Sequence, residues 1–129
     1  MRILEDKDRE LYTEFLTKHD RCNFQQSLEW AKVKDAWKNE IVLAEGENGE
    51  IVGSISILIR KIPIFGNLMY SSRGPVCDIY NDDVMKQLTD GAKEIAKKYN
   101  AFVFKVEPDI KSSDEEFRKV VTKLGYKIK

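Results

Sequence analysis

The chain has 129 residues, with 22 lysines and arginines against 22 aspartates and glutamates, so its formal net charge is zero. Apolar residues make up 42% and charged residues 34%, which is too apolar for a disordered chain and too charged for a membrane-embedded one. Because phosphate affinity needs a surplus of basic side chains, this balance argues against a dominant nucleic-acid surface, though not against a local basic patch.

The length predicts one domain with a single core. The two cysteines, Cys22 and Cys77, have neither CxxC spacing nor a histidine cluster, which argues against zinc ligation and a disulfide framework. The apolar runs are far shorter than the roughly 20 residues that cross a bilayer. Residues 1–8 lack the apolar region of a secretory signal. We therefore expect a cytoplasmic domain with reduced thiols, no bound metal and no transmembrane segment.

Two helices are predicted before the first strand. Residues 6–18 carry their apolar side chains at helical spacing among charges, which indicates an amphipathic helix. Ser27 is a favourable N-cap for a second helix that runs to about residue 35. Trp30 and Trp37, seven positions apart, fall on one face, which we interpret as core or as a surface that faces another domain.

The apolar period then changes to that of strands. Asn48-Gly49 lies between two apolar runs and predicts a hairpin, because both residues tolerate positive φ. Pro63 cannot donate to a ladder and ends the returning strand. Strands are expected over residues 41–44, 51–61 and 67–70, followed by a loop over residues 71–75.

Helices and strands alternate in the second half. Asn81 is expected to cap a helix with its inner face at residues 84, 88, 92, 95, 96 and 99. The compact run at residues 101–106 predicts a central strand. Ser113-x-x-Glu116 has the form of a capping box for a last helix, and Gly125 occupies the position of a C′ glycine. The final residues, 125–129, are interpreted as the start of another strand.

The resulting order, α-α-β-β-β-α-β-α, predicts a mixed α/β sheet flanked by helices. It is similar to the element order of the Gcn5-related acetyltransferase fold. That fold cradles the pyrophosphate of acetyl-CoA on a glycine-rich turn, which supplies free backbone N–H groups at a helix N-terminus. The corresponding junction here, residues 70–78, has one glycine, and Pro75 removes a donor. Acetyl-CoA is therefore disfavoured, and no cofactor is predicted.

Four motifs follow one another along the chain. They are Gln26-Ser27-x-x-Trp30-x-x-Val33-Lys34, Pro63-x-Phe65-Gly66, Tyr70-x-x-Arg73-Gly74-Pro75-Val76-x-Asp78 and Val106-Glu107-Pro108. Together and in this order they resemble the Fem family (FemA, FemB and FemX type) of non-ribosomal aminoacyl transferases. The resemblance extends from about residue 23 to residue 126. No single motif is specific, but the ordered set is.

The resemblance implies a particular architecture and reaction. Fem proteins consist of two acetyltransferase-like domains, and residues 1–129 resemble the first, the N-terminal half. The family transfers an amino acid from aminoacyl-tRNA to the stem-peptide amine of a lipid-linked or UDP-linked peptidoglycan precursor, which builds the interpeptide bridge. This implies the precursor, aminoacyl-tRNA and a second Fem domain as partners. It also implies a workplace in the cytoplasm, at the inner face of the cell membrane.

Four residues are candidates for the site, each with a structural alternative. By the resemblance, Lys34 contacts the precursor near its phosphates; otherwise it is a solvated charge on a short helix. Arg73 binds phosphate or carboxylate, or only stabilises its loop. Tyr70 donates a hydrogen bond to substrate, or is a half-buried strand residue. Asp78 is the candidate general base, or a cap or loop anchor. Cys77, beside it, is interpreted as an inert thiol.

Two other functions remain open at this point. The chain could be a non-catalytic module that binds a precursor, pairs with its missing half or self-associates through an exposed strand edge. It could also be an acyl-CoA N-acyltransferase, which saturable acetyl-CoA binding would support. On the Fem hypothesis the aminoacyl ester is already activated, so the protein aligns two substrates and removes a proton.

Overall fold

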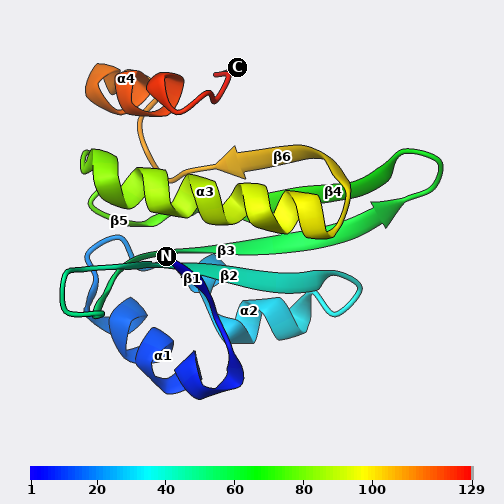
Figure 1. Cartoon of the computed structure of the whole chain (residues 1–129), viewed down its shortest axis with the longest axis horizontal. Coiled ribbons are helices and arrows are strands. Elements are labelled where there is room, and N and C mark those ends of the chain that lie inside the picture. The colour runs from blue at the N-terminus through cyan, green and yellow to red at the C-terminus, as the bar shows by residue number, and fades with distance from the viewer. Residues whose placement is uncertain (129) are drawn as a thin grey trace.

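The computed structural model describes residues 1–128 and folds them around one mixed sheet (Figure 1). The path of neighbouring strands is β1-β2-β3-β4-β6, and β5 pairs with β3 beside that path. The strands are β1 (Arg2–Ile3), β2 (Lys38–Glu45), β3 (Ile51–Ile62), β4 (Gly66–Ser72), β5 (Val76–Cys77) and β6 (Ala101–Glu107). The helices are α1 (Arg9–Lys18), α2 (Leu28–Val33), α3 (Asp82–Lys98) and α4 (Glu115–Lys123), with 3-10 turns η1 (Asp6–Asp8) and η2 (Phe24–Gln26).

The strands from β1 to β4 pair antiparallel, whereas β6 lies parallel to β4. A parallel pair needs a crossover connection, and α3 provides it between β4 and β6. In Figure 1, α3 and α4 lie on one side of the sheet, and α1 and α2 lie on the other. This is the predicted α/β sheet flanked by helices.

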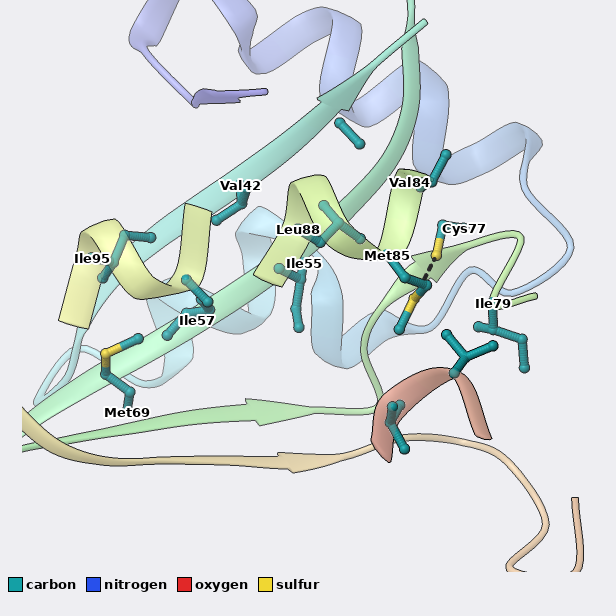
Figure 2. Close-up of a cluster of buried hydrophobic side chains, with 14 of the residues drawn as sticks. Val42, Ile55, Ile57, Met69, Cys77, Ile79, Val84, Met85, Leu88 and Ile95 are labelled. Atoms are coloured by element: carbon teal, nitrogen blue, oxygen red, sulfur yellow. Dashed lines mark hydrogen bonds between the residues drawn. The ribbon is translucent and has the colours of Figure 1, made fainter. Parts of the chain in front are cut away.

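The larger core lies between the sheet and α3 (Figure 2). Leu88 and Ile95 of α3 point toward Ile55 and Ile57 of β3, and each of the four side chains is at most 4% exposed. The periodicity that predicted the inner face of α3 is confirmed, because its apolar residues at helical spacing are buried. A smaller cluster on the opposite face packs around Tyr12 of α1. Burial on both faces makes β3 an almost continuous buried strand.

The sheet is split beside the middle of β3. Leu58 of β3 is opposite Tyr70 of β4, whereas Ser54 of β3 is opposite Val76 of β5. Within residues 1–128, Ser56, between these two pairings, therefore has no strand partner on that side. The fully buried side chain of Gln26 fills the gap and accepts a hydrogen bond from the Ser56 N–H at 2.8 Å. This contact fixes η2, and with it the start of α2, against the sheet.

Several local predictions are confirmed. Ser27 caps α2 by accepting a hydrogen bond from the Trp30 N–H, and Asn81 caps α3 in the same way through Val84. Gly125, at φ +97°, ends α4. The N–H of Tyr126 reaches back to the Val121 carbonyl at 3.0 Å, as a C-terminal glycine motif requires.

Other predictions are wrong. Residues 101–106 are not a central strand: β6 is the last strand on the path, and most of its side chains are at least partly exposed. Asp114, not Ser113, caps α4, because its carboxylate accepts the Phe117 N–H. Residues 126–128 form no strand, and residue 129, the end of that predicted strand, lies outside the described residues. The very short β1 and β5 were not expected, since two residues carry no periodicity.

Candidate functional site

Helix α2 and the segment after it place Lys34 against an aromatic ring. Ser27 starts the helix, and Lys34 is its C-cap, with its N–H bonded to the Trp30 carbonyl at 3.1 Å. The Lys34 ammonium lies 4.9 Å from the centroid of the Trp30 ring, and the residue is half-buried. A cation over an indole face is stabilised by the ring quadrupole. Lys34 is therefore held by Trp30 rather than extended freely into solvent.

Trp37 connects this segment to the sheet. Its N–H bonds to the Lys34 carbonyl at 2.9 Å, and its ring lies 6.5 Å from that of Tyr70 on β4. The guanidinium of Arg60, on β3, lies 5.7 Å from the Trp37 ring centroid. Trp37 thus links two predicted site residues, through its backbone to Lys34 and through its ring to Tyr70.

Tyr70 donates a hydrogen bond to a carboxylate at the end of β6. Its hydroxyl lies 3.1 Å from Oε2 of Glu107, and Lys105 Nζ lies 3.3 Å from Glu107 Oε1. The Tyr70 hydrogen bond and the Lys105 charge lower the pKa of the Glu107 carboxyl below its usual range, with a smaller contribution from Arg73. Glu107 is therefore ionised at neutral pH and orients the Tyr70 hydroxyl.

Arg73 follows β4 and adopts φ +62°, a left-handed conformation that is uncommon outside glycine. Its N–H donates to the Glu107 carbonyl at 2.7 Å, and its guanidinium lies 3.6 Å from Asp109. Arg73 is thus held beside Glu107 by its backbone, and its side chain pairs with Asp109. We call Lys34, Trp37, Tyr70, Arg73 and Glu107 the α2–β4 cluster.

Asp78 lies apart from this cluster. It follows Cys77, which is opposite Gly53, whereas Tyr70 is opposite Leu58. Asp78 is one residue further along than Cys77, so six residues of β3, or about 20 Å at the usual strand rise, separate it from the row of Tyr70. The Asp78 carboxylate accepts the Tyr80 N–H at 3.0 Å, so it anchors the turn before α3. The carboxylate remains exposed, so this loop contact leaves it accessible from solvent.

Cys77, next to Asp78, is fully buried and contacts the sulfur of Met85 at 3.6 Å (Figure 2). Burial, together with the nearby Asp78 charge, raises the pKa of its thiol to about 12. Thiol catalysis uses the thiolate as its nucleophile, and a thiol with this pKa is almost entirely protonated at neutral pH. The structure therefore agrees with the interpretation of Cys77 as an inert thiol.

Glu107 and Trp37 are the two members of the cluster that were not predicted as site residues. Glu107 belongs to the quoted Val106-Glu107-Pro108 motif, but nothing in its spacing relates it to Tyr70. The relation arises only because β6 lies parallel to β4 and brings residue 107 opposite Ser72. Trp37 was assigned to a helix face, whereas in the structure it follows α2. The one feature of the sequence that could have pointed to Glu107 is its place as a carboxylate at the end of a predicted strand.

Within residues 1–128, no group of three or more histidine, cysteine, aspartate or glutamate side chains is arranged to hold a metal ion. Within the same residues, no helix combines the length and the apolar character needed to span a bilayer. The polar side chains of the cluster are a lysine, an arginine, a phenol and a carboxylate, and the two basic groups suit phosphate or carboxylate recognition.

Comparison with known proteins gives a family match over almost the whole chain: residues 8–127 match the model of the FemAB family. A UDP-N-acetylmuramoylpentapeptide-lysine N(6)-alanyltransferase from Weissella viridescens is 33% identical over 117 residues, 91% of this chain and 34% of that protein. A lipid II:glycine glycyltransferase from Staphylococcus epidermidis is 35% identical over 119 residues, 89% of this chain and 28% of that protein. The chain thus spans about a third of the length of these relatives.

Solved structures give the same result. A crystal structure of FemX superimposes with a TM-score of 0.85 and 30% identity, over 98% of this chain and 32% of that one. A probable acetyltransferase superimposes with a TM-score of 0.69 over all of this chain and 91% of that one, at 14% identity. The second likeness concerns the fold alone and confirms the acetyltransferase-like architecture predicted from the order of elements.

Proposed function

The chain belongs to the FemAB family, and from that premise we propose that it is the precursor-binding domain of an aminoacyl transferase of the peptidoglycan interpeptide bridge. The observation that carries this is the α2–β4 cluster, which joins two basic residues to an aromatic pair: Lys34 lies over Trp30, Trp37 lies beside Tyr70, and Arg73 follows β4 and pairs with Asp109. A UDP-linked or lipid-linked precursor carries a diphosphate, and lysine and arginine side chains recognise that negative charge. Two similar relatives are named for muropeptide and lipid II substrates.

In the proposed reaction the free amine of the stem peptide attacks the ester carbonyl of an aminoacyl-tRNA. A C–N bond forms, the ester C–O bond breaks, and the tRNA leaves through its ribose oxygen. The amine gives up a proton, which passes to a base and finally to that oxygen. Because the ester is already activated, the protein mainly aligns the two substrates.

Asp78 is the proposed base. It lies about 20 Å from Tyr70 along β3, and a peptide of five extended residues, about 17 Å long, spans most of that distance. A precursor whose phosphates lie at the α2–β4 cluster can therefore extend its stem peptide along the sheet toward Asp78. The exposure of the Asp78 carboxylate leaves it accessible to an incoming amine.

The same proposal includes an interaction surface and a place of work. The outer side of β6 has no strand partner among residues 1–128, and Val103 there is 41% exposed. We propose that the second Fem domain, or another copy of the chain, covers this edge. We also propose that the protein works in the cytoplasm at the inner membrane face, where lipid-linked precursors lie.

Acyl-CoA transfer is the alternative that the fold suggests. In this structure the N-terminus of α3 carries Asp82 and Asp83 in its first turn, and Asn81 already caps it. Carboxylates at a helix N-terminus occupy the region that would otherwise attract an anion. This arrangement argues against a pyrophosphate at α3.

The test is an NMR titration of the 129-residue chain with three ligands: UDP-N-acetylmuramoyl pentapeptide, UDP-N-acetylmuramic acid without the peptide, and acetyl-CoA. We expect both UDP ligands to shift Lys34, Tyr70 and Arg73, and only the pentapeptide to shift Asp78. Lys34→Gln should weaken binding, whereas Lys32→Gln, an exposed lysine of the same helix, should not. Shifts with acetyl-CoA alone would replace the proposal with acyl-CoA transfer. Shifts with none of the three would remove the precursor site from this domain.

A further inference from the structure

The β3–β4 hairpin projects from one end of the long axis of the molecule and carries an apolar tip (Figure 1). We define the hairpin tip as Pro63, Ile64 and Phe65. Ile64 is 100% exposed and Phe65 is 69% exposed. The Phe65 ring lies 6.2 Å from that of Phe102 on β6, which is itself 52% exposed. These rings and Ile64 form one apolar surface that nothing in residues 1–128 covers.

The residue at the apex is unusual for a turn. Ile64 adopts φ +78°, a conformation that glycine and asparagine accept and that is an outlier for a β-branched side chain. Turn chemistry would favour a small polar residue here. Instead the chain holds a large apolar side chain in a strained position with full exposure to water. Strain of this kind is found where the surrounding structure uses it for a function.

A collar of positive charge surrounds the base of the hairpin. Three segments meet there, since Lys38 is opposite Ile59 and the Asn67 amide donates to the Tyr99 carbonyl at 2.6 Å. We define the collar as Lys38, Arg60, Lys61, Lys97 and Lys98. The same segments, residues 35–40, 58–67 and 97–102, contain two carboxylates, Asp35 and Glu40. Glu40 pairs with Lys98 at 2.7 Å, and the five basic side chains still outnumber the two carboxylates, so this end of the molecule has an excess of positive charge.

Aromatic rings lie among these charges. Lys38 Nζ is 5.6 Å and Lys98 Nζ is 5.2 Å from the centroid of the Tyr99 ring, and the Arg60 guanidinium is 5.7 Å from that of Trp37. Tyrosine and tryptophan are enriched where a protein meets the headgroup layer of a membrane, and lysine and arginine attract anionic headgroups there. The order along the hairpin is therefore apolar tip, then aromatic rings with basic side chains.

We propose that the hairpin tip inserts into an anionic phospholipid surface, with the basic collar at the level of the headgroups. A second copy of the chain is a poorer occupant, because a stable protein interface buries about 800 Å² on each partner and three side chains fall short of that. The role of this membrane contact rests on the proposed function: insertion of the hairpin tip would bring the Trp37 side of the α2–β4 cluster close to a lipid-linked precursor.

The test is flotation of the 129-residue chain with vesicles of phosphatidylglycerol and phosphatidylethanolamine, compared with phosphatidylcholine alone. We expect binding to the anionic vesicles that weakens as salt rises. The double variant Ile64→Asn, Phe65→Ser should bind at least about tenfold more weakly, because each buried side chain of this size contributes on the order of a tenfold preference. Asn tolerates the φ of residue 64, so the variant should keep its circular dichroism spectrum and melting temperature.

A matched control separates the tip from general apolar exposure. Leu11 on α1 is 53% exposed and far from the hairpin, and Leu11→Gln should bind vesicles like the wild type. Equal binding of the tip variant, or no binding of the wild type to anionic vesicles, would overturn the proposal. A concentration-dependent dimer that the tip variant abolishes would assign the surface to a second copy.

The two proposals fail separately. The soluble ligand UDP-N-acetylmuramoyl pentapeptide needs no membrane, so the tip variant should still bind it with wild-type affinity. Loss of vesicle binding alone removes the membrane contact and leaves the precursor site intact. Loss of precursor binding with retained vesicle binding removes the proposed function and leaves the membrane contact.

Discussion

The side-chain oxygen of Gln26 accepts the backbone N–H of Ser56 at 2.8 Å in the middle of β3. The amide nitrogen of Gln26 donates to the Ser72 carbonyl at 2.7 Å, and Ser71 Oγ donates to the Ser56 carbonyl at 2.8 Å. One side chain thus supplies the hydrogen bonds that a strand would make between β5 and β4. It also couples η2, which leads into the helix that carries Lys34, to the sheet.

We expect Gln26→Leu to destabilise the fold by about 2–4 kcal/mol. Leucine has a similar volume, but it leaves the buried Ser56 N–H and the part-buried Ser72 carbonyl without their partner, and a fully buried group of this kind costs about 1–3 kcal/mol. Urea unfolding followed by circular dichroism measures the difference. A loss below about 1 kcal/mol would mean that water enters the split and replaces the amide.

The contact of α3 with β2 predicts an unfavourable Gly91→Ala substitution. A methyl group at residue 91 would lie 2.2 Å from Cγ1 and 3.2 Å from Cβ of Val42. Alanine improves helix propensity by about 1 kcal/mol, whereas overpacking costs about 1–3 kcal/mol, so a net loss of stability is expected. The double variant Gly91→Ala, Val42→Ala removes the clash and should recover part of the loss in the same urea assay. A stabilised single variant would show that α3 moves away from the sheet freely.

The Tyr70–Glu107 hydrogen bond predicts a pH effect. Because the folded-state pKa of Glu107 is lowered, first by Tyr70, its stabilising contribution is present above the ordinary carboxyl pKa and is lost as pH falls through the folded value. In Tyr70→Phe the pKa of Glu107 should rise toward its ordinary range. NMR titration of the Glu107 side-chain carbon measures this shift. An unchanged pKa would assign the effect to Lys105 instead.

The two thiols should differ in reactivity. Cys22 is exposed, whereas Cys77 is buried with a pKa near 12, so a thiol reagent at neutral pH should modify Cys22 rapidly and Cys77 only after unfolding. Mass spectrometry of the modified protein with and without denaturant measures this. Cys22→Ser serves as the control, since it should remove the fast reaction. Fast modification of Cys77 in that variant would show that β5 opens readily.

Much of the fold was predictable because its signals are local. The caps at Ser27 and Asn81, the glycine at residue 125 and the apolar spacing of α3 each act within a few residues along the chain. The predictions that β6 is central and that a last strand begins at residue 125 were wrong because the position of a strand depends on residues distant in the sequence. A compact apolar run shows that a strand forms, but only its neighbours in the sheet decide whether it lies at the centre or at the edge.

The hairpin at Asn48-Gly49 shows the same division in one loop. Its existence was predicted, but among these two residues only Gly49 adopts positive φ, and Gly46 bonds to the Glu50 carbonyl at 2.9 Å across a longer loop. The residue types at a turn determine that the chain reverses. The pairing of β2 with β3, which has an irregular register at Ala44 and Glu45, determines the length and conformation of the loop.

By itself, the sequence determined the order of elements, the family and the identity of Lys34, Tyr70 and Arg73 as candidates, because spacing and motif order are properties of the chain. Only the tertiary structure decided that Glu107 meets Tyr70, that Asp78 lies about 20 Å from Tyr70 along β3 and that Gln26 fills the split sheet. Tyr70 and Glu107 are 37 positions apart in the sequence, and Gln26 and Ser56 are 30 positions apart. They depend on strand register and parallel pairing, which no local pattern encodes.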